Sequence, residues 1–140
     1  MKEFLTTCEE ETFFVAGEIA KSLKNPTIIV LEGDVGAGKT HFVKGFAKAL
    51  GYEDIVTSPT FTILNEYECD GFYIYHFDMY RLSSMEDAVA LGFEEYLDLN
   101  NLNGFALVEW AENVEGLIPK EAVKVQIFKE GERKRRIVLI

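Results

Sequence analysis

Basic side chains are scarce in this chain of 140 residues, which carries 14 Lys and Arg against 24 Asp and Glu and a formal net charge of −10. A protein that grips nucleic acid across its surface has to neutralise several phosphates with clustered cations. An acidic chain is poorly suited to that task. We therefore expect most of the surface to have no direct role in binding nucleic acid.

Long apolar runs and cysteines are also few. The longest aliphatic stretches, 28–31 and 137–140, fall far short of the roughly 20 residues that span a bilayer, and the N-terminal region is acidic where a secretory signal is apolar. Cys8 and Cys69 show no metal-type spacing, and we expect both to be free and reduced. These absences predict a cytoplasmic protein without a membrane span.

Proline is rare too, with 3 residues, whereas 48% of the chain is hydrophobic and 13% is aromatic, which excludes a disordered or low-complexity chain. A chain of this length buries about two-thirds of its unfolded surface and needs no disulfide or metal to hold a core. No linker, repeat or biased tract divides the sequence. We expect a single domain over residues 1–140.

Apolar patterning alternates between strands and helices in the first half of the chain and predicts hairpins in the second half. This order predicts an α/β domain with a mixed parallel and antiparallel sheet. The expected elements are a short strand at 4–5, a helix from a capping box at 7–10 to Pro26, a strand at 27–31, a helix at 39–50, two strands around an Asp70-Gly71 turn, a helix at 84–97, a strand at 105–108, and strands at 123–128 and 135–140 around a Glu130-Gly131 turn.

A glycine-rich segment between the strand at 27–31 and the next helix matches the phosphate-loop pattern G-x-x-x-x-G-K-[ST] at every fixed position. Its glycines allow successive N–H groups to point inward at an anion. The pattern predicts a P-loop nucleotide site for ATP, with Lys39 on phosphate and the Thr40 hydroxyl on Mg²⁺. His41 is either a helix-surface residue or a further nucleotide contact. The positions expected to bind nucleotide are Gly33, Asp34, Gly36, Ala37, Gly38, Lys39, Thr40 and His41.

Two carboxylates fall at the ends of strand-like runs. Glu109 follows four apolar residues, at the end of a strand where open α/β sheets place their ligands, and we expect it to hold Mg²⁺. Asp78 shares a strand face with His76 and is a candidate for positioning water or for holding a water ligand of Mg²⁺; the alternative is a pairing with Arg81. The alternative for Glu109 is an acid that is exposed to solvent after the strand. Trp110, the next residue, either packs in the core or covers the site as a lid.

The segment 57–62 carries four hydroxyl side chains in six residues. A loop of this kind could sense the γ-phosphate, becoming ordered when it is present and loosening after hydrolysis. An ordinary turn before a strand explains the same residues equally well.

Other nucleotide enzymes fit less well. The guanine-reading pattern Asn-Lys-x-Asp is absent, and a small-molecule kinase usually clamps phosphoryl groups with several arginines, of which this chain has four. A kinase stays an alternative, as does a nucleotide-dependent assembly factor that does not rely on hydrolysis.

Taken together, residues 33–40, Ser58-Pro59-Thr60-Phe61-Thr62, the His76 to Leu82 segment and Leu107-Val108-Glu109-Trp110 resemble the TsaE family. This family comprises bacterial ATPases required for threonylcarbamoylation of adenosine in tRNA. Met79 and His41 replace residues that are more usual in the family. The order and spacing of the motifs agree over nearly the whole chain.

The resemblance implies a P-loop NTPase-like three-layer domain, Mg²⁺-ATP binding and a weak ATPase activity stimulated by the partner proteins TsaB and TsaD, which connect it indirectly to tRNA. It also implies roles at matching positions. Lys39 would bind phosphate, Thr40 and Glu109 would hold Mg²⁺, Thr60 would be a switch-like hydroxyl, Asp78 a catalytic acid, and Glu10 and Gly131 would lie near the adenine.

Charge is unevenly distributed along the chain. Residues 82–119 hold eight acids and no Lys or Arg, which is typical of a solvated face and could also be a docking surface for a basic partner. Residues 129–136 are rich in Lys and Arg. We interpret this run as an exposed strand guarded against edge pairing, with contact to RNA as the alternative.

Overall fold

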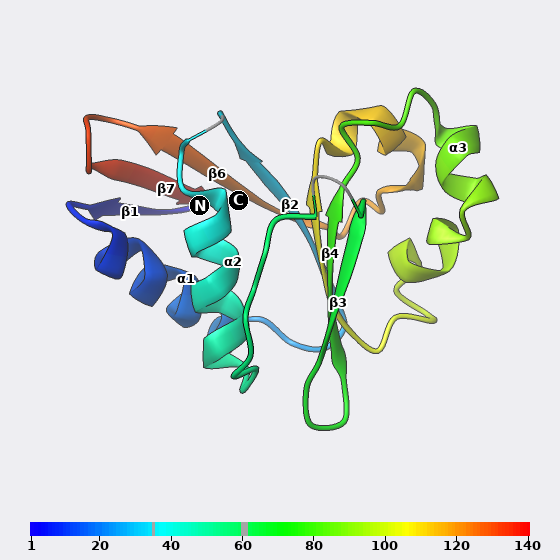
Figure 1. Ribbon diagram of the computed structural model, residues 1–140, viewed down its shortest axis with the longest axis horizontal. Coiled ribbons are helices and arrows are strands. Elements are labelled where there is room, and N and C mark those ends of the chain that lie inside the picture. The colour runs from blue at the N-terminus through cyan, green and yellow to red at the C-terminus, as the bar shows by residue number, and fades with distance from the viewer. Residues whose placement is uncertain (35, 60–61) are drawn as a thin grey trace.

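A single mixed sheet organises the protein, for which we describe residues 1–34, 36–59 and 62–140 of a computed structural model (Figure 1). Within these residues the sheet has seven strands in the order β1-β7-β6-β2-β5-β4-β3. The strands are β1 (Lys2–Thr6), β2 (Thr27–Gly33), β3 (Leu64–Glu68), β4 (Tyr73–Asp78), β5 (Gly104–Glu109), β6 (Val123–Lys129) and β7 (Arg135–Leu139).

The centre of the sheet is parallel and its margins are antiparallel. Strand β2 pairs in parallel with β5 and β6, and β5 pairs in parallel with β4, whereas β1, β7 and β3 run antiparallel to their neighbours. Every residue of β5 is buried, as expected for an apolar strand covered on both faces. Because β2, β4 and β5 are parallel, their carboxyl ends lie at one edge of the sheet.

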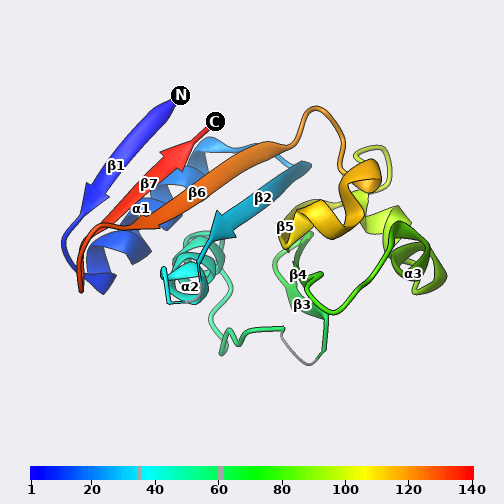
Figure 2. The ribbon, with the colours of Figure 1, turned by 90° about the horizontal axis from the view of Figure 1, so that it is seen from above.

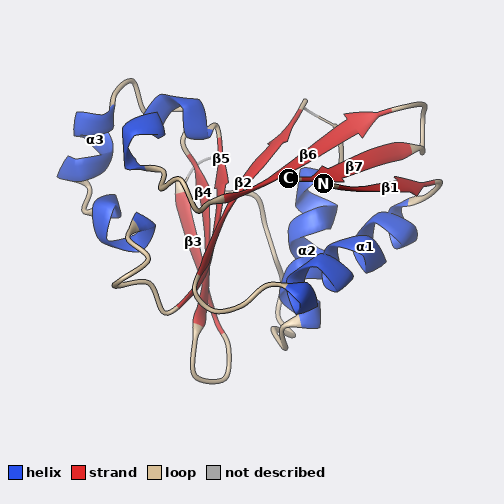
Figure 3. Cartoon of the chain, turned by 180° about the vertical axis from the view of Figure 1, so that it is seen from behind, coloured by secondary structure: helices blue, strands red, loops and turns tan. Residues whose placement is uncertain are grey.

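Helices cover both faces of the sheet, which gives three layers (Figures 2 and 3). One face carries α1 (Glu9–Ser22) and α2 (Lys39–Ala49), and the other carries α3 (Met85–Ala90) with the 3₁₀ helices η1 (Phe93–Leu97) and η2 (Ala111–Leu117). Alternate residues of β2 enter two separate cores: Ile29 joins the cluster under α1 and α2, and Ile28 joins the cluster under α3, η1 and η2. The expected α/β class and mixed sheet are therefore confirmed.

Two helix predictions differ from the structure. The expected helix at 84–97 is broken, because Gly92 adopts a left-handed φ of 80° that no α-helix continues through, so α3 ends at Ala90 and η1 follows. The first helix begins after Cys8, and its capping carboxylate is that of Glu11, not Glu10. Helix η2 was not expected from the sequence.

The position of β7 in the sheet also differs from the prediction. The basic run at 129–136 suggested an exposed edge, but β7 pairs with β6 on one side and with β1 on the other. The edges of the described sheet are β1 and β3. The N-terminal strand thus covers β7, and the basic residues need an explanation other than protection of an edge. Among the described residues, no helix has the length and apolar character needed to cross a membrane.

Candidate active site

The phosphate loop, residues 33–40, joins the end of β2 to the start of α2, as expected. Its glycines at 36 and 38 adopt left-handed φ angles of 83° and 104°, which side chains with a Cβ rarely take. Gly38 is the residue before α2, and its carbonyl accepts the N–H of Phe42 at 3.0 Å. Val35 lies outside the described residues. The loop therefore delivers the N-terminus of a helix to the carboxyl edge of the sheet, where a helix attracts anions.

Lys39 and Glu109 meet at this edge. Lys39 Nζ lies 3.3 Å from Glu109 Oε1, and both side chains are largely buried, at 13% and 9% exposed. Lys39 comes from the phosphate loop and Glu109 from the end of β5. The structure thus brings together two residues that lie far apart in the sequence, at the start of α2 and at the end of β5.

His76 completes this cluster, and sequence analysis gave it no role of its own. The ring is fully buried in β4, and its Nε2 lies 2.6 Å from Glu109 Oε2. Burial raises the pKa of Glu109, but the hydrogen bond from His76 and the electrostatic attraction of His76 and Lys39 outweigh it and leave the pKa below its ordinary value. Glu109 is therefore an ionised carboxylate, and Nε2–H of His76 donates to it.

Asp78 lies beside Glu109, because the two residues are register partners on β4 and β5. The carboxylate is 9% exposed, and its Oδ1 accepts the backbone N–H of Tyr80 at 3.0 Å. This bond holds the side chain at the carboxyl edge of the sheet. Two acids on adjacent parallel strands therefore lie side by side at this edge of the sheet, and one of them, Glu109, contacts Lys39 of the phosphate loop.

Trp110 forms a partly open wall of the site. The residue is 39% exposed with a left-handed φ of 57°, its ring lies 4.9 Å from that of Tyr80, and Lys39 Nζ lies 6.0 Å from the ring centroid. Such exposure contradicts the core-packing alternative and places Trp110 beside the lysine. The left-handed turn re-aims the chain directly after Glu109.

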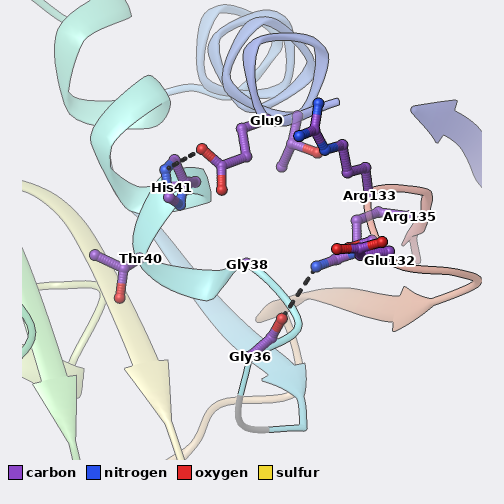
Figure 4. Close-up of a pocket in the computed structure, with 9 residues that line it drawn as sticks. Glu9, Gly36, Gly38, Thr40, His41, Glu132, Arg133 and Arg135 are labelled. Atoms are coloured by element: carbon purple, nitrogen blue, oxygen red, sulfur yellow. Dashed lines mark hydrogen bonds and ion pairs between the residues drawn. The ribbon is translucent and has the colours of Figure 1, made fainter. Parts of the chain in front are cut away.

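A pocket of about 310 Å³ lies on the other side of the α2 N-terminus (Figure 4). His41 points across it to Glu9, with Nε2 3.1 Å from Oε2, so His41 belongs to its wall and is not merely a helix-surface residue. The lining residues come from α1, the phosphate loop, α2, the β6–β7 turn and the start of β7: Glu9, Thr12, Gly36, Gly38, Thr40, His41, Glu132, Arg133 and Arg135.

Glu10 and Gly131, the positions expected near adenine, flank this pocket in the chain without lining it. A hydrogen bond from Cys8, the local backbone and the charge of Arg133 lower the pKa of the exposed Glu10. The Gly131 carbonyl accepts a bond from Arg135 at 3.2 Å. Both residues therefore lie next to pocket residues that come from different elements.

Thr60 and Phe61, at the centre of the hydroxyl loop, lie outside the described residues. The loop is tied to β3 on both sides: Asn65 Nδ2 donates to the Thr57 carbonyl at 3.0 Å, and the Thr62 hydroxyl donates to Asn65 Oδ1 at 2.8 Å. The backbone N–H of Asp78 donates to the carbonyl of Ile63, the residue after the loop, at 2.8 Å. The end of the loop thus connects directly to the strand that carries Asp78.

Arg135 is the second site residue that sequence analysis missed. Its guanidinium donates to the carbonyls of Ala37 and Gly36 in the phosphate loop at 2.7 and 3.1 Å (Figure 4). Its only signal in the sequence is its place in the basic run, a pattern that predicts an exposed strand. Polarity inside a buried strand was the corresponding signal for His76.

Comparisons with known proteins agree with this arrangement. A family model described as "Threonylcarbamoyl adenosine biosynthesis protein TsaE" matches residues 6–137. The chain is 42% identical to the TsaE protein of Bacillus subtilis over 94% of its own length and 80% of that protein, and 39% identical to the TsaE protein of Aquifex aeolicus over 98% and 96%. The crystal structure of Bacillus subtilis YdiB superposes with a TM-score of 0.78 at 36% identity, covering 99% of this chain and 83% of that one. With its phosphate loop, its paired acids and these relatives, the chain belongs to the TsaE family of threonylcarbamoyladenosine biosynthesis proteins.

Proposed function

We propose that this protein binds Mg²⁺-ATP at the phosphate loop and hydrolyses it in the service of tRNA threonylcarbamoyladenosine synthesis. The observation that carries the proposal is the convergence of Lys39 with Glu109, 3.3 Å apart at the carboxyl edge of the sheet. A lysine on a glycine-rich loop and an acid at the end of a neighbouring strand are the groups that P-loop ATPases need.

The phosphate loop would bind the polyphosphate through its backbone N–H groups and Lys39. The left-handed Gly36 and Gly38 allow the loop to curve around an anion, and the α2 N-terminus adds its partial positive charge. Lys39 would exchange its ion pair with Glu109 for one with phosphate. The carboxylate would then be left to His76 and to the metal.

Mg²⁺ fits the residues at this edge. No cluster of three or more His, Cys, Asp or Glu side chains suited to a metal occurs among residues 1–34, 36–59 and 62–140. A cation here would need nucleotide and water oxygens, which is how Mg²⁺ usually binds in such sites. Thr40 and Glu109 would supply the protein oxygens. Bound Mg²⁺-ATP would supply the phosphoanhydride bond that is broken and the charge neutralisation for its cleavage.

Asp78 would orient water at the reacting end. Its Oδ1 accepts the backbone N–H of Tyr80, which fixes the direction in which the carboxylate points. Thr60 and the hydroxyl loop would respond to the γ-phosphate, and the bond from Asp78 to Ile63 offers a route by which that response reaches β4. Catalysis would rest on positioning and electrostatics.

The nucleoside would extend from the phosphate loop toward the pocket of Figure 4, near Glu10 and Gly131.

We further propose a cytoplasmic protein that acts with TsaB and TsaD and reaches tRNA only through them. A small-molecule kinase is less favoured, because Arg135 is committed to backbone carbonyls and Arg136 to Glu130, so neither serves as a clamp.

Two variants separate hydrolysis from binding alone. Lys39→Ala should lose ATP and ADP binding by at least tenfold in calorimetry, and Glu109→Ala should keep binding and lose ATPase activity. If hydrolysis matters, both should fail to sustain repeated rounds of tRNA modification with purified TsaB and TsaD. If only Lys39→Ala fails, the protein is an assembly factor. Full modification by Lys39→Ala would overturn the proposal. ATPase rates with and without the partners would measure stimulation.

A further inference from the structure

The guanidinium of Arg135 donates hydrogen bonds to five backbone carbonyls. Its Nε donates to Ala37 at 2.7 Å and its Nη2 to Gly36 at 3.1 Å. Its Nη1 donates to three carbonyls of the β6–β7 turn: Gly131 at 3.2 Å, Glu132 at 3.3 Å and Lys134 at 2.9 Å. One side chain therefore joins the phosphate loop to a turn that lies nearly one hundred residues further along the chain.

These bonds reach the loop where its conformation matters for anion binding. For successive N–H groups to face an anion, the carbonyls between them have to face away from it. Arg135 holds two consecutive carbonyls, those of Gly36 and Ala37, on its own side. Gly36 lies in the left-handed region, and glycine loses more conformational freedom on ordering than any other residue. A fixed partner for these carbonyls reduces the freedom that phosphate binding would otherwise have to remove.

The residue that makes these bonds belongs to a strand that is paired on both sides. Arg135 is the first residue of β7, with Thr6 of β1 as its register partner on one side and Lys129 of β6 on the other. The fixed fork of arginine donors suits two adjacent carbonyls, whereas the lysine ammonium is a compact charge on a flexible stem and fixes their direction less well. The neighbouring Arg136 differs: its Nε donates to Glu130 at 2.7 Å, and its guanidinium lies 4.3 Å from the Phe128 ring centroid.

From this geometry we propose that Arg135 is a positioning residue, which holds the phosphate loop in its anion-binding curvature and ties it to the β6–β7 turn. The inference rests on the proposed nucleotide binding and extends it to a residue far from the loop in sequence. It also assigns one residue of the basic run at 129–136 an internal role in place of edge protection.

The test uses the full chain with Arg135→Gln, Arg135→Lys and the matched control Arg136→Gln. Arg135→Gln and Arg136→Gln remove the same charge one residue apart, and Arg135→Lys keeps the charge without the fork. If the untied loop is competent about a tenth of the time, the Kd for ADP rises about tenfold in both Arg135 variants. The control should stay within twofold of wild type. The KM for ATP should rise similarly while kcat changes little.

Hydrogen exchange supplies a readout that needs no nucleotide. The Ala37 amide donates to the Asp34 carbonyl at 2.9 Å inside the loop. Peptides covering residues 34–40 should exchange faster in both Arg135 variants than in wild type and Arg136→Gln, with the core strands unchanged. Unchanged exchange in the loop would overturn the inference. Faster exchange with unaltered ADP affinity would overturn it too, because the loop would then not need the tie.

The outcomes also separate this inference from the proposed function. Failure of wild type to bind ADP or ATP would refute the proposed function, whereas the exchange comparison would still decide whether Arg135 orders the loop. If Arg135→Lys behaves like wild type, charge and not the fork is what matters, and the positioning role is refuted.

Discussion

Glu109 is a buried carboxylate held between two basic side chains, with His76 at 2.6 Å and Lys39 at 3.3 Å. Burying an ion costs several kcal/mol unless partners offset it. If nucleotide draws Lys39 away, His76 is the partner that stays, since it is fixed in the core of β4. His76 thus keeps Glu109 ionised and oriented at the edge of the sheet.

Removing His76 should expose this dependence. We expect His76→Phe to lower the free energy of unfolding by about 3 kcal/mol in urea titration, because it leaves Glu109 short of a partner in the interior. Glu109→Gln should reduce that penalty, so the double variant His76→Phe with Glu109→Gln should be more stable than the sum of the single effects. Additive effects of the two substitutions would contradict the coupling.

Sequence reasoning predicts the candidate site residues that depend on a local pattern. Lys39 and Thr40 are set by the spacing of a motif, and Glu109 by its place after an apolar strand. His76 and Arg135 depend on contacts with residues 33 and 98 positions away, respectively, which no local pattern encodes. His76 meets Glu109 because β4 and β5 are neighbours in the sheet, and the order of the strands cannot be deduced from a local pattern.

At the level of elements, the start of helix α1 depends on a single carboxylate. Glu11 Oε1 accepts the backbone N–H of Thr7 at 2.6 Å and also the Thr7 hydroxyl. The Thr7 side chain and backbone lower the pKa of Glu11 below its ordinary value. A lowered pKa in the folded state means that the ionised cap stabilises the protein above the unfolded pKa, about 4.3, and loses this effect as pH falls through the folded value.

Glu11→Gln should therefore melt at a lower temperature than wild type at pH 7. The difference should shrink as pH falls below about 4, because the wild-type carboxyl then becomes neutral like the amide. Thermal unfolding followed by circular dichroism between pH 3 and pH 7 would measure both curves. A constant difference across that range would show that charge at this cap has no role.

The contact between α1 and α2 depends on a glycine. A Cβ at Gly45 would lie 2.2 Å from the Phe13 carbonyl oxygen of α1, a clash with backbone that no rotamer change relieves. Replacing glycine by alanine usually stabilises a helix by about 1 kcal/mol. Here we expect Gly45→Ala to destabilise by about 1–3 kcal/mol, because the helices have to separate.

The matched control for Gly45 is on the facing helix. A Cβ at Gly17 would lie 3.2 Å from Ala49 Cβ, a tight contact between side chains. Urea unfolding should find Gly17→Ala less destabilised than Gly45→Ala. Equal stability of Gly45→Ala and wild type would indicate that the two helices are less closely packed than the structure has them.

Local patterns also predict most helices and strands. They do not predict the features that depend on contacts with residues elsewhere in the chain. The strand at 27–31 and the helix at 39–50 follow from apolar runs and glycine stops, and they occur as β2 and α2. The helical pattern at 84–97 overlooked Gly92. For β7, the strand itself was expected, but its interior position was not, since its cover is β1, from the opposite end of the chain.

Across the whole molecule, two observations argue against direct binding of RNA: the net charge of −10, and the contacts that basic residues of the run at 129–136 already make within the protein. Arg135 donates to five backbone carbonyls, and Arg136 pairs with Glu130. Glu130 and Glu132 dilute what remains at 129–136. The basic run at 129–136 therefore offers fewer cations to RNA than its sequence suggests.

The isolated protein should accordingly bind tRNA only weakly. Binding that neutralises several phosphates loses affinity steeply with salt, and a surface with this charge has few cations to contribute. In filter binding we expect no measurable complex with tRNA at micromolar protein and about 150 mM salt, whether or not ATP is present. Lys134→Glu, which removes an exposed cation of the run, should make no difference. Tight binding that Lys134→Glu abolishes would instead make the β6–β7 turn an RNA contact and would overturn the view that tRNA is reached only through partners.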